Sequence, residues 1–369
     1  MDNVTLYCSI IEAMRQVKLS AANSSDSAID YLSVCIHGIA SFFGVLENGL
    51  IIWIVGFRMR KSVITTWILN LAVSDFMTTL SLPFFTYFMA TGQTWKLGTF
   101  FCRVHSSIFF LNMFVSSFLL CAISIDRCVL IVYPVWSQNN RNEQQASRIC
   151  AGLWVLAIIN TLPYFLFRDT IPRYDGRIMC YYNFMLYSSP GNKSFELCGM
   201  RQYSMAISKF IIAFVMPVFI IAVCYTAVTK KIRTRNRKTP GRFFKLVVAI
   251  IITFVLCWFP YHIFSIMEAH AHYKMSLGPL VGKALPFVSS LAFINSIINP
   301  CLYVFSCPDF IAKFRTSIRV VLEHVLVEDT ELATRRSTAK SSLSSDNPMR
   351  GYKFANCKDI LMSEPSASN

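Results

Sequence analysis

Residues 203–228 read YSMAISKFIIAFVMPVFIIAVCYTAV. This apolar run is longer than the ~20 residues that an α-helix needs to cross the hydrocarbon of a bilayer. It contains one charged residue, Lys209. A charge inside such a run is costly, so it is usually retained for a function. The run therefore predicts a membrane-spanning helix that carries a functional cation.

Six further runs are similarly apolar. The seven runs occupy residues 34–57, 65–90, 99–132, 147–167, 203–229, 243–269 and 281–306. The chain is 54% hydrophobic and 15% charged, with a mean hydropathy of +0.47. That composition is too apolar for an ordinary soluble domain of this length. The sequence predicts an all-α membrane protein, a bundle of seven transmembrane helices.

The net charge of +15 reflects basic residues that gather beside the apolar runs. Three groups follow the first, fifth and seventh runs: Arg58, Arg60 and Lys61; eight lysines and arginines within residues 230–245; and Lys313, Arg315 and Arg319. All three groups lie on one side if seven helices alternate, and the positive-inside rule makes that side cytoplasmic. Topology explains this charge, so we do not expect nucleic-acid binding.

Three N-glycosylation sequons begin at Asn3, Asn23 and Asn192. All three fall on the side predicted to be extracellular, which supports a plasma-membrane protein with its N-terminus outside. The expected divisions are an extracellular segment (1–32), the seven-helix bundle (33–306), an amphipathic helix on the membrane surface (307–322) and a disordered cytoplasmic tail (323–369).

Four cysteines lie outside the apolar runs or at their outer ends, in an oxidising compartment. Cys102 at the head of the third run and Cys180 in the next outer loop are natural partners, which leaves Cys8 to join Cys198. Sequence alone does not settle the connectivity of these bonds.

Seven short motifs follow one another in order, one for each run. They are Glu47-Asn48-Gly49, Leu71-Ala72-Val73-Ser74-Asp75, Asp126-Arg127-Cys128, Trp154, Pro217, Cys257-Trp258-Phe259-Pro260 and Asn299-Pro300-Cys301-Leu302-Tyr303. With these motifs the chain resembles a rhodopsin-like (class A) G protein-coupled receptor over residues 30–320. The resemblance implies a receptor rather than an enzyme, and the sequence contains no nucleophile–base pair or metal cluster that would suggest catalysis.

A closer resemblance is to the chemoattractant-type prostaglandin receptors. It rests on residues 82–88 (LPFFTYF), 105–114 (HSSIFFLNMF), 167–170 (FRDT), 175–183 (DGRIMCYYN), 208–210 (SKF), 260–262 (PYH) and 285–287 (LPF). It implies a receptor for prostaglandin D2 or a related acidic lipid. It also implies an inhibitory (Gi-class) G protein as partner, lowered cyclic AMP and chemotaxis.

The expected ligand site is centred on Lys209, which either reaches a central cavity or extends to the membrane interface. Trp258, Tyr261, Ser265 and Glu268 recur at helical spacing and share one face of the sixth helix. Tyr261 offers a hydroxyl at the depth of Lys209. Glu268 is either part of the site or a solvated acid at the helix end.

The outer loop after the fourth run contains Asp175-Gly176 between extended flanks, which predicts a β-hairpin. A bond from Cys180 to the third helix would make the hairpin a lid that carries Arg177 and Tyr182 over the cavity. The resemblance implies that Arg168, Tyr182, Lys209 and Tyr261 hold a ligand carboxylate. The alternative interpretation of Arg168 is a plain interfacial charge.

Apolar walls would suit a lipid tail. The candidates are His105, Phe109, Phe110, Phe85, Phe88 and Phe293. Aromatic residues at helical spacing are also common as packing residues, so each of these has that second interpretation.

Asp75 is a lone acid deep in the second run, and an ionisable group in a membrane is a functional candidate. The residues expected around it are Asn112, Ser116, Asn295 and Asn299. The resemblance implies a bound sodium ion as an allosteric ligand, and a hydrogen-bond network without an ion is the alternative. No other cofactor is expected.

Arg127 and Asp126 form a local pair that should hold Arg127 inward at rest. Cys128 departs from the family pattern, in which tyrosine usually follows the arginine. The resemblance implies that Trp258 and Tyr303 are switch residues and that opening around Pro260 exposes Arg127 to a G protein. Serine-rich residues 337–345 are candidates for receptor kinases and arrestin.

Two alternatives remain open. A peptide chemoattractant receptor of the same class would also use a hairpin lid and a basic pocket. A membrane transporter or channel would need a solute path, to which Asp75 would contribute one polar step, but the sequence contains no inverted repeat.

Overall fold

The structure, a computed structural model, describes residues 7–16, 24–188, 194–234 and 242–306. The three sequons at Asn3, Asn23 and Asn192 lie outside the described residues, as do the expected surface helix 307–322 and the tail 323–369.

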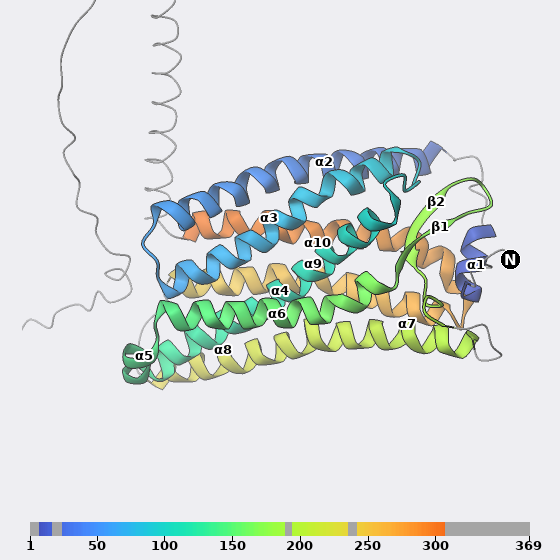
Figure 1. Ribbon diagram of the computed structural model, residues 1–369. Coiled ribbons are helices and arrows are strands. Elements are labelled where there is room, and N and C mark those ends of the chain that lie inside the picture. Colours follow the sequence, from blue (N-terminus) through green and yellow to red (C-terminus); the bar gives the residue numbers. More distant parts are fainter. Residues whose placement is uncertain (1–6, 17–23, 189–193, 235–241, 307–369) are drawn as a thin grey trace, which may run out of the picture. The chain divides into compact units, whose positions relative to one another are not determined.

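Seven helices within the described part of the chain are long and apolar enough to cross a membrane. They form a bundle of roughly aligned helices (Figure 1), so the predicted fold class is confirmed. Their bounds, in chain order, are α2 (Ser24–Trp53), α3 (Val63–Ala90), α4 (Gly98–Val132), α6 (Glu143–Leu166), α7 (Ser194–Phe210) continued by α8 (Met216–Thr234), α9 (Arg242–Ala271) and α10 (Gly278–Ser306).

The structure adds helices that apolar run length does not predict. The helix α2 begins at Ser24, ten residues before the predicted apolar run. Hydropathy did not predict this start, because the first turns of the helix are largely polar. Two short helices, α1 (Ser9–Gln16) and α5 (Pro134–Asn140), lie in segments that link or precede the spans. A 3₁₀ turn, η3 (Met275–Leu277), precedes α10.

The helix α4 lies at the centre of the bundle and packs against α3, α6 and α8. It buries large side chains, including Phe114 and Leu119, along most of its length. In contrast, α6 exposes Val155, Ile158 and Ile159 on one face. In a membrane protein such an exposed apolar face lies against lipid, because hydrocarbon removes the cost of exposing apolar side chains.

Two spans contain a π-helical turn, which inserts one extra residue into an α-helix. The turn η1 (Ile54–Arg58) ends the first span. The turn η2 (Ile211–Val215) separates α7 from α8 and begins two residues after Lys209. Prolines lie within α3, α6, α9 and α10, where each removes one backbone donor.

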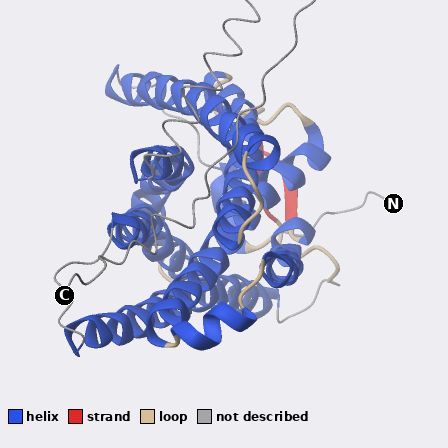
Figure 2. Cartoon of the chain, turned by 90° about the vertical axis from the view of Figure 1, so that its left-hand side faces the viewer, coloured by secondary structure: helices blue, strands red, loops and turns tan. Residues whose placement is uncertain are grey.

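The outer loop between α6 and α7 folds into the predicted hairpin. Strand β1 (Arg168–Pro172) pairs antiparallel with β2 (Ile178–Tyr182), and Arg168 lies opposite Tyr182. Gly176 has a φ of 82° in the turn, a conformation that glycine adopts without strain. Figure 2, which views the long helices nearly end-on, shows these two strands in red. The end of the bundle that carries the hairpin is called the outer end below.

Candidate functional site

The Lys209 side chain points into the bundle rather than toward the membrane interface. Its ammonium donates to Ser265 Oγ at 2.6 Å and to Tyr261 Oη at 3.4 Å. It also lies 4.8 Å from the centre of the Tyr261 ring and 5.2 Å from that of Phe110. Only 4% of Lys209 is exposed. Its described partners are neutral, so the cation is buried without a directly bonded anion.

A second cation, Arg168, lies at the start of the hairpin. Its guanidinium carbon is 4.5 Å from the centre of the Tyr182 ring, within cation–π range. The Arg168 Nε atom is buried and has no hydrogen-bond partner among the described residues. A buried donor of this kind is costly unless a ligand or water satisfies it.

Glu268, on α9, faces the same region, and the Tyr181 hydroxyl donates to its Oε1 atom. Arg168 lies 5.9 Å from the centre of the same Tyr181 ring, so Tyr181 contacts both the acid and this cation. We call Lys209, Tyr261, Ser265, Arg168, Tyr181, Tyr182 and Glu268 the Lys209 cluster. It brings two cations, one acid and four hydroxyl groups together beneath the outer end of the bundle.

Burial raises the pKa of Tyr182, partly opposed by the positive charge of Arg168. Burial likewise raises the pKa of Tyr181, and the nearby Glu268 carboxyl adds to the effect. Both phenols therefore keep their protons at neutral pH and remain hydrogen-bond donors.

Aromatic rings surround the cluster on its inner side. Phe109 lies 5.2 Å from Tyr261, 5.4 Å from Trp258 and 5.0 Å from Phe293, between ring centres. Phe110 is buried at 4% exposure. The structure thus gathers three of the predicted apolar residues, Phe109, Phe110 and Phe293, together with Trp258 on this side of the Lys209 cluster.

A second aromatic group lies between α3 and α4. Phe85 stacks on His105 at 5.8 Å and also contacts Phe88 and Phe293. Phe293 therefore links this group to the rings around Trp258. The predicted apolar residues therefore form one continuous set of contacting rings.

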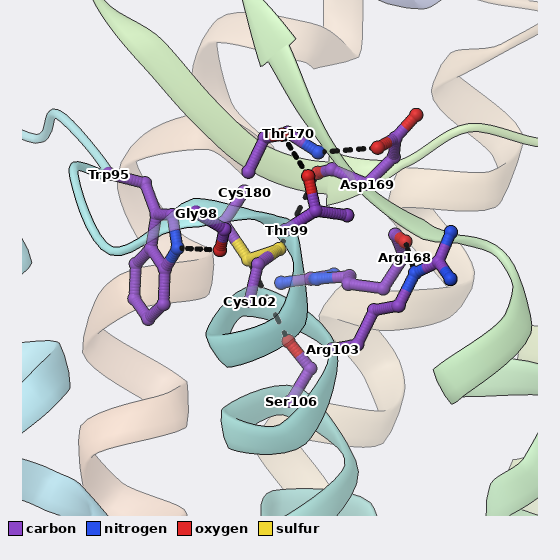
Figure 3. The surroundings of a disulfide bond; sticks show 10 residues. All are labelled: Trp95, Gly98, Thr99, Cys102, Arg103, Ser106, Arg168, Asp169, Thr170 and Cys180. Atoms are coloured by element: carbon purple, nitrogen blue, oxygen red, sulfur yellow. Dashed lines mark hydrogen bonds between the residues drawn. A yellow bond between two sulfur atoms is a disulfide. The ribbon is translucent and has the colours of Figure 1, made fainter.

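The hairpin is fastened to α4 by a disulfide bond between Cys102 and Cys180 (Figure 3). Thr99 and Thr170 share a hydrogen bond of 2.6 Å, and Arg103 Nε donates to the Arg168 carbonyl at 2.8 Å. These contacts fix the backbone of Arg168, and its guanidinium is thereby held at the Lys209 cluster.

The expected Cys8–Cys198 bond would pin the N-terminal segment over the outer loop, and the described part of that segment folds there into the helix α1. A disulfide bond joins Cys8 to Cys198, the second of the two favoured pairs. Arg15 Nε donates to the Pro172 carbonyl at 2.8 Å, and the Tyr174 hydroxyl donates to Glu12 at 2.7 Å. That hydrogen bond lowers the pKa of Glu12. The short helix is therefore tied to both the hairpin and α7.

Arg177 occupies a different place from the one expected. Its guanidinium pairs with Asp175 at 2.5 Å inside the hairpin turn, and this hydrogen bond lowers the pKa of Asp175 to about 2. The structure therefore satisfies this charge locally, and it does not join Arg177 to the Lys209 cluster.

The predicted polar core is assembled around Asp75, which is fully buried. Asn112 Nδ2 donates to Asp75 Oδ1 at 3.0 Å, and Asn299 Nδ2 donates to Oδ2 at 2.9 Å. Ser116 Oγ, Asn295 Oδ1 and Asn299 Oδ1 are buried without hydrogen-bond partners among the described residues. These oxygens and the carboxylate are of the type that hard cations prefer.

At the inner end of α4, Arg127 pairs with Asp126 at 2.9 Å, as predicted. Asp126 has a second partner, because Arg141 Nε donates to its Oδ1 atom at 2.6 Å. Trp258, one of the two predicted switch residues, is 1% exposed and lies against Phe109. Tyr303 lies in the last turns of α10.

Sequence reasoning missed Tyr181 and Arg141 as functional candidates. Tyr181 and Tyr182 are adjacent on strand β2. Nothing in the local sequence shows which of the two tyrosines bonds to Glu268 on α9. Ser265 did carry a signal, since it shares the face of α9 with Trp258, Tyr261 and Glu268.

Comparisons with known proteins place this geometry in a family. The model for the 7 transmembrane receptor (rhodopsin family) matches residues 47–303. The prostaglandin D2 receptor 2 of Mus musculus is 55% identical over 348 residues, covering 93% of this chain and 91% of the relative. The receptor of the same name from Rattus norvegicus is 55% identical over 336 residues, covering 90% of this chain and 83% of the relative.

More distant relatives have names that refer to other receptors. Chemerin-like receptor 1 of Homo sapiens is 39% identical over 304 residues, which cover 80% of each chain. A seven-helix bundle, the ordered motifs and these matches agree, and the protein is a multi-pass protein of the plasma membrane. The chain belongs to the rhodopsin family of seven-transmembrane receptors.

Proposed function

We propose that this receptor binds prostaglandin D2 or a related acidic lipid and signals through an inhibitory G protein, lowering cyclic AMP and promoting chemotaxis. The observation that carries the proposal is the buried Lys209 ammonium, bonded only to neutral described partners, beside the unpartnered Arg168 Nε. A carboxylate would satisfy both cations, and its bonds to them strengthen in a low-dielectric site. The names of the relatives at 55% identity agree with this ligand.

In the proposed complex, Lys209 and Arg168 receive the carboxylate, and Tyr182 and Tyr261 donate their hydroxyl protons to it. The aromatic set packs against the apolar chain of the lipid. Glu268 remains bonded to Tyr181, which keeps its negative charge from occupying the ligand position. Arg177 stays paired with Asp175 in the hairpin turn and does not contact the ligand.

Signal transmission is proposed to run from Trp258 to the inner end of the bundle. Ligand binding biases a two-state movement of α9 around Pro260. Arg127 then leaves Asp126 and becomes accessible to the G protein, with Tyr303 as a further switch residue. The tail carries the proposed sites for receptor kinases and arrestin.

A sodium ion at Asp75 is proposed as an allosteric ligand of the resting state. The carboxylate and the unpartnered oxygens of Ser116, Asn295 and Asn299 would hold it, and Asn112 would orient the carboxylate. The ion would supply positive charge for a buried acid.

The test is inhibition of cyclic AMP formation in transfected cells by prostaglandin D2 and by its methyl ester. We expect the acid to act on the wild type, the ester to be weaker, and both Lys209→Ala and Arg168→Ala to reduce potency at least about tenfold. The matched control is Lys274→Ala, which removes an exposed lysine from the outer loop before α10.

A peptide chemoattractant receptor is the second candidate, favoured by the names of relatives at 36–39% identity. A panel of formyl peptides and chemerin-derived peptides distinguishes the two. A peptide response without a prostaglandin response, at equal surface expression, would contradict the lipid assignment. Transport of a solute without G-protein activation would favour a transporter.

A further inference from the structure

A cavity of about 130 Å³ lies between α6 and α7 and extends to Lys209. Its lining includes Asn160, Tyr164, Ser208 and Lys209. Ser208 is exposed on the side of the bundle that faces the membrane, whereas Lys209 is buried. The cavity therefore connects the membrane-facing surface of the receptor with the charged site.

The surroundings of this opening are apolar, as expected for a surface in contact with lipid. Ile159, which also lines the cavity, is 60% exposed, and Leu162 is 51% exposed. Ile159 precedes the outer end of α6 at Leu166 by seven residues, a distance of about 10 Å along a helix. The opening thus lies at the depth of the outer lipid leaflet, not in water.

Both helices are irregular at this level. Pro163 in α6 lacks an N–H group, so the Ile159 carbonyl cannot accept its usual helical hydrogen bond. On the other side, the π turn η2 begins two residues after Lys209. The two interruptions border the same cavity and reduce regular packing between the spans.

Tyr164, on α6, lines the cavity beside Lys209. The Tyr164 ring stacks on Phe110 at 4.0 Å, and its hydroxyl donates to the Met205 carbonyl at 3.1 Å. The ring centre is 5.8 Å from the Lys209 ammonium. Rotation of this one residue would break a single hydrogen bond between α6 and α7 and widen the passage.

From above, the cluster is covered by two disulfide-linked elements, the hairpin and α1. Ile11 and Ile171, on these two elements, are completely buried in the cover. An acidic lipid dissolves in the membrane through its apolar chain, and its carboxylate is drawn toward a cation that it can reach from the lipid. The described contacts thus favour the side opening over the covered top.

We propose that the acidic lipid ligand reaches Lys209 from the outer leaflet through the opening between α6 and α7, with Tyr164 as the gate. This inference rests on the proposed function, because it assumes a carboxylate lipid as ligand. Ser208 and Asn160 provide polar groups that the carboxylate passes before it meets Lys209.

The experiment measures association and dissociation rate constants of tritiated prostaglandin D2 on membranes that contain the full-length receptor. Ser208→Trp should obstruct the opening and lower both rate constants by the same factor, at least about fivefold, with Kd unchanged. A barrier on the path slows access and escape equally and leaves the equilibrium unaltered. Tyr164→Phe should raise both constants, because the gate loses its hydrogen bond.

The matched control is Ser204→Trp. Ser204 is exposed one turn closer to the outer end of α7 and, like Ser208, donates to a carbonyl of its own helix. It does not line the cavity, so both rate constants should remain at the wild-type values. The double variant Cys8→Ala/Cys198→Ala, which releases α1, should also leave association unchanged.

Ligand entry through the side opening would be contradicted if Ser208→Trp associated at the wild-type rate. It would also be contradicted if the double cysteine variant were the only variant with faster association. Absence of saturable prostaglandin D2 binding to the wild type is a separate result. It would contradict the proposed function itself, and the side opening would fall with it.

Discussion

Lys209 is both buried and positively charged, a combination that lowers the stability of the receptor and favours the binding of an anion. Burying an ammonium among neutral partners costs free energy, and replacing a buried charge by an apolar side chain is often stabilising. The same ammonium is available to an anionic ligand, because its hydrogen-bond partners Ser265 and Tyr261 are neutral. A purely structural lysine would not show this conflict.

We predict that Lys209→Met raises the free energy of unfolding of the ligand-free receptor by about 1 kcal/mol. The same variant should lose at least about tenfold in affinity for prostaglandin D2, equivalent to 1.4 kcal/mol. Thermal unfolding of purified receptor and radioligand binding measure the two effects. Lys274→Met, an exposed control, should change neither. Lower stability with unchanged affinity would show that Lys209 is structural.

Tyr181 is predicted to restrain the acid of the Lys209 cluster. Tyr181→Phe removes its hydrogen bond to Glu268, and the freed carboxylate should then compete with the ligand for Lys209 and Arg168. We expect a loss of about 1 kcal/mol in binding, near fivefold. The double variant Tyr181→Phe/Glu268→Gln should recover affinity, because the competing charge is absent. Additive losses in the double variant would exclude competition.

Among the elements, the π turn η2 sets the direction in which Lys209 points. A π turn contains one residue more than an α turn, and each residue of an α-helix turns the chain by about 100°. The side chains before and after η2 are thus offset relative to a continuous helix. Lys209 in α7 donates a hydrogen bond to Ser265, while Pro217 in α8 remains buried in the bundle.

Deletion of Ala213 should convert η2 into regular α-helix and rotate α7 relative to α8. Lys209 would turn away from Ser265, and prostaglandin D2 affinity should fall by at least about tenfold. Cell-surface staining controls for folding, and Ile211→Ala, a substitution in the same turn, should retain binding. Wild-type affinity in the deletion variant would show that the offset is unimportant.

Across the molecule, Asp75 connects three spans. Its carboxylate on α3 accepts hydrogen bonds from Asn112 on α4 and Asn299 on α10. Any ligand that binds this core in the resting arrangement alone will shift the two-state equilibrium away from the agonist-bound form. The polar core can therefore couple ionic conditions to agonist affinity.

We predict that sodium chloride, compared with choline chloride at equal ionic strength, lowers agonist affinity of the wild type. Asp75→Asn should lose this difference, because the neutral amide has no charge for a cation. Competition binding with agonist in both salts is the measurement, and Asp175→Asn, in the hairpin turn, is the control acid. Equal affinities in the two salts for the wild type would contradict a sodium site.

Run length, charge asymmetry and ordered motifs are local properties of the chain, and they were sufficient to predict seven spans and Lys209 as a candidate. Each depends on how neighbouring residues partition between water and hydrocarbon, which needs no knowledge of packing. The hairpin required only Asp175-Gly176 and its extended flanks. The exposed apolar face of α6 is likewise explained by its surroundings, because that face lies in the hydrocarbon of the membrane.

The partners of the site residues depend on contacts between distant parts of the chain. Ser265 is 56 residues from Lys209, and Tyr181 is 87 residues from Glu268. Their pairing follows from the rotation of α7 by η2 and from the Cys102–Cys180 bond that holds β2 against α4. The offset of a π turn and the facing of two helices result from the packing of the whole bundle, so tertiary structure alone specifies them.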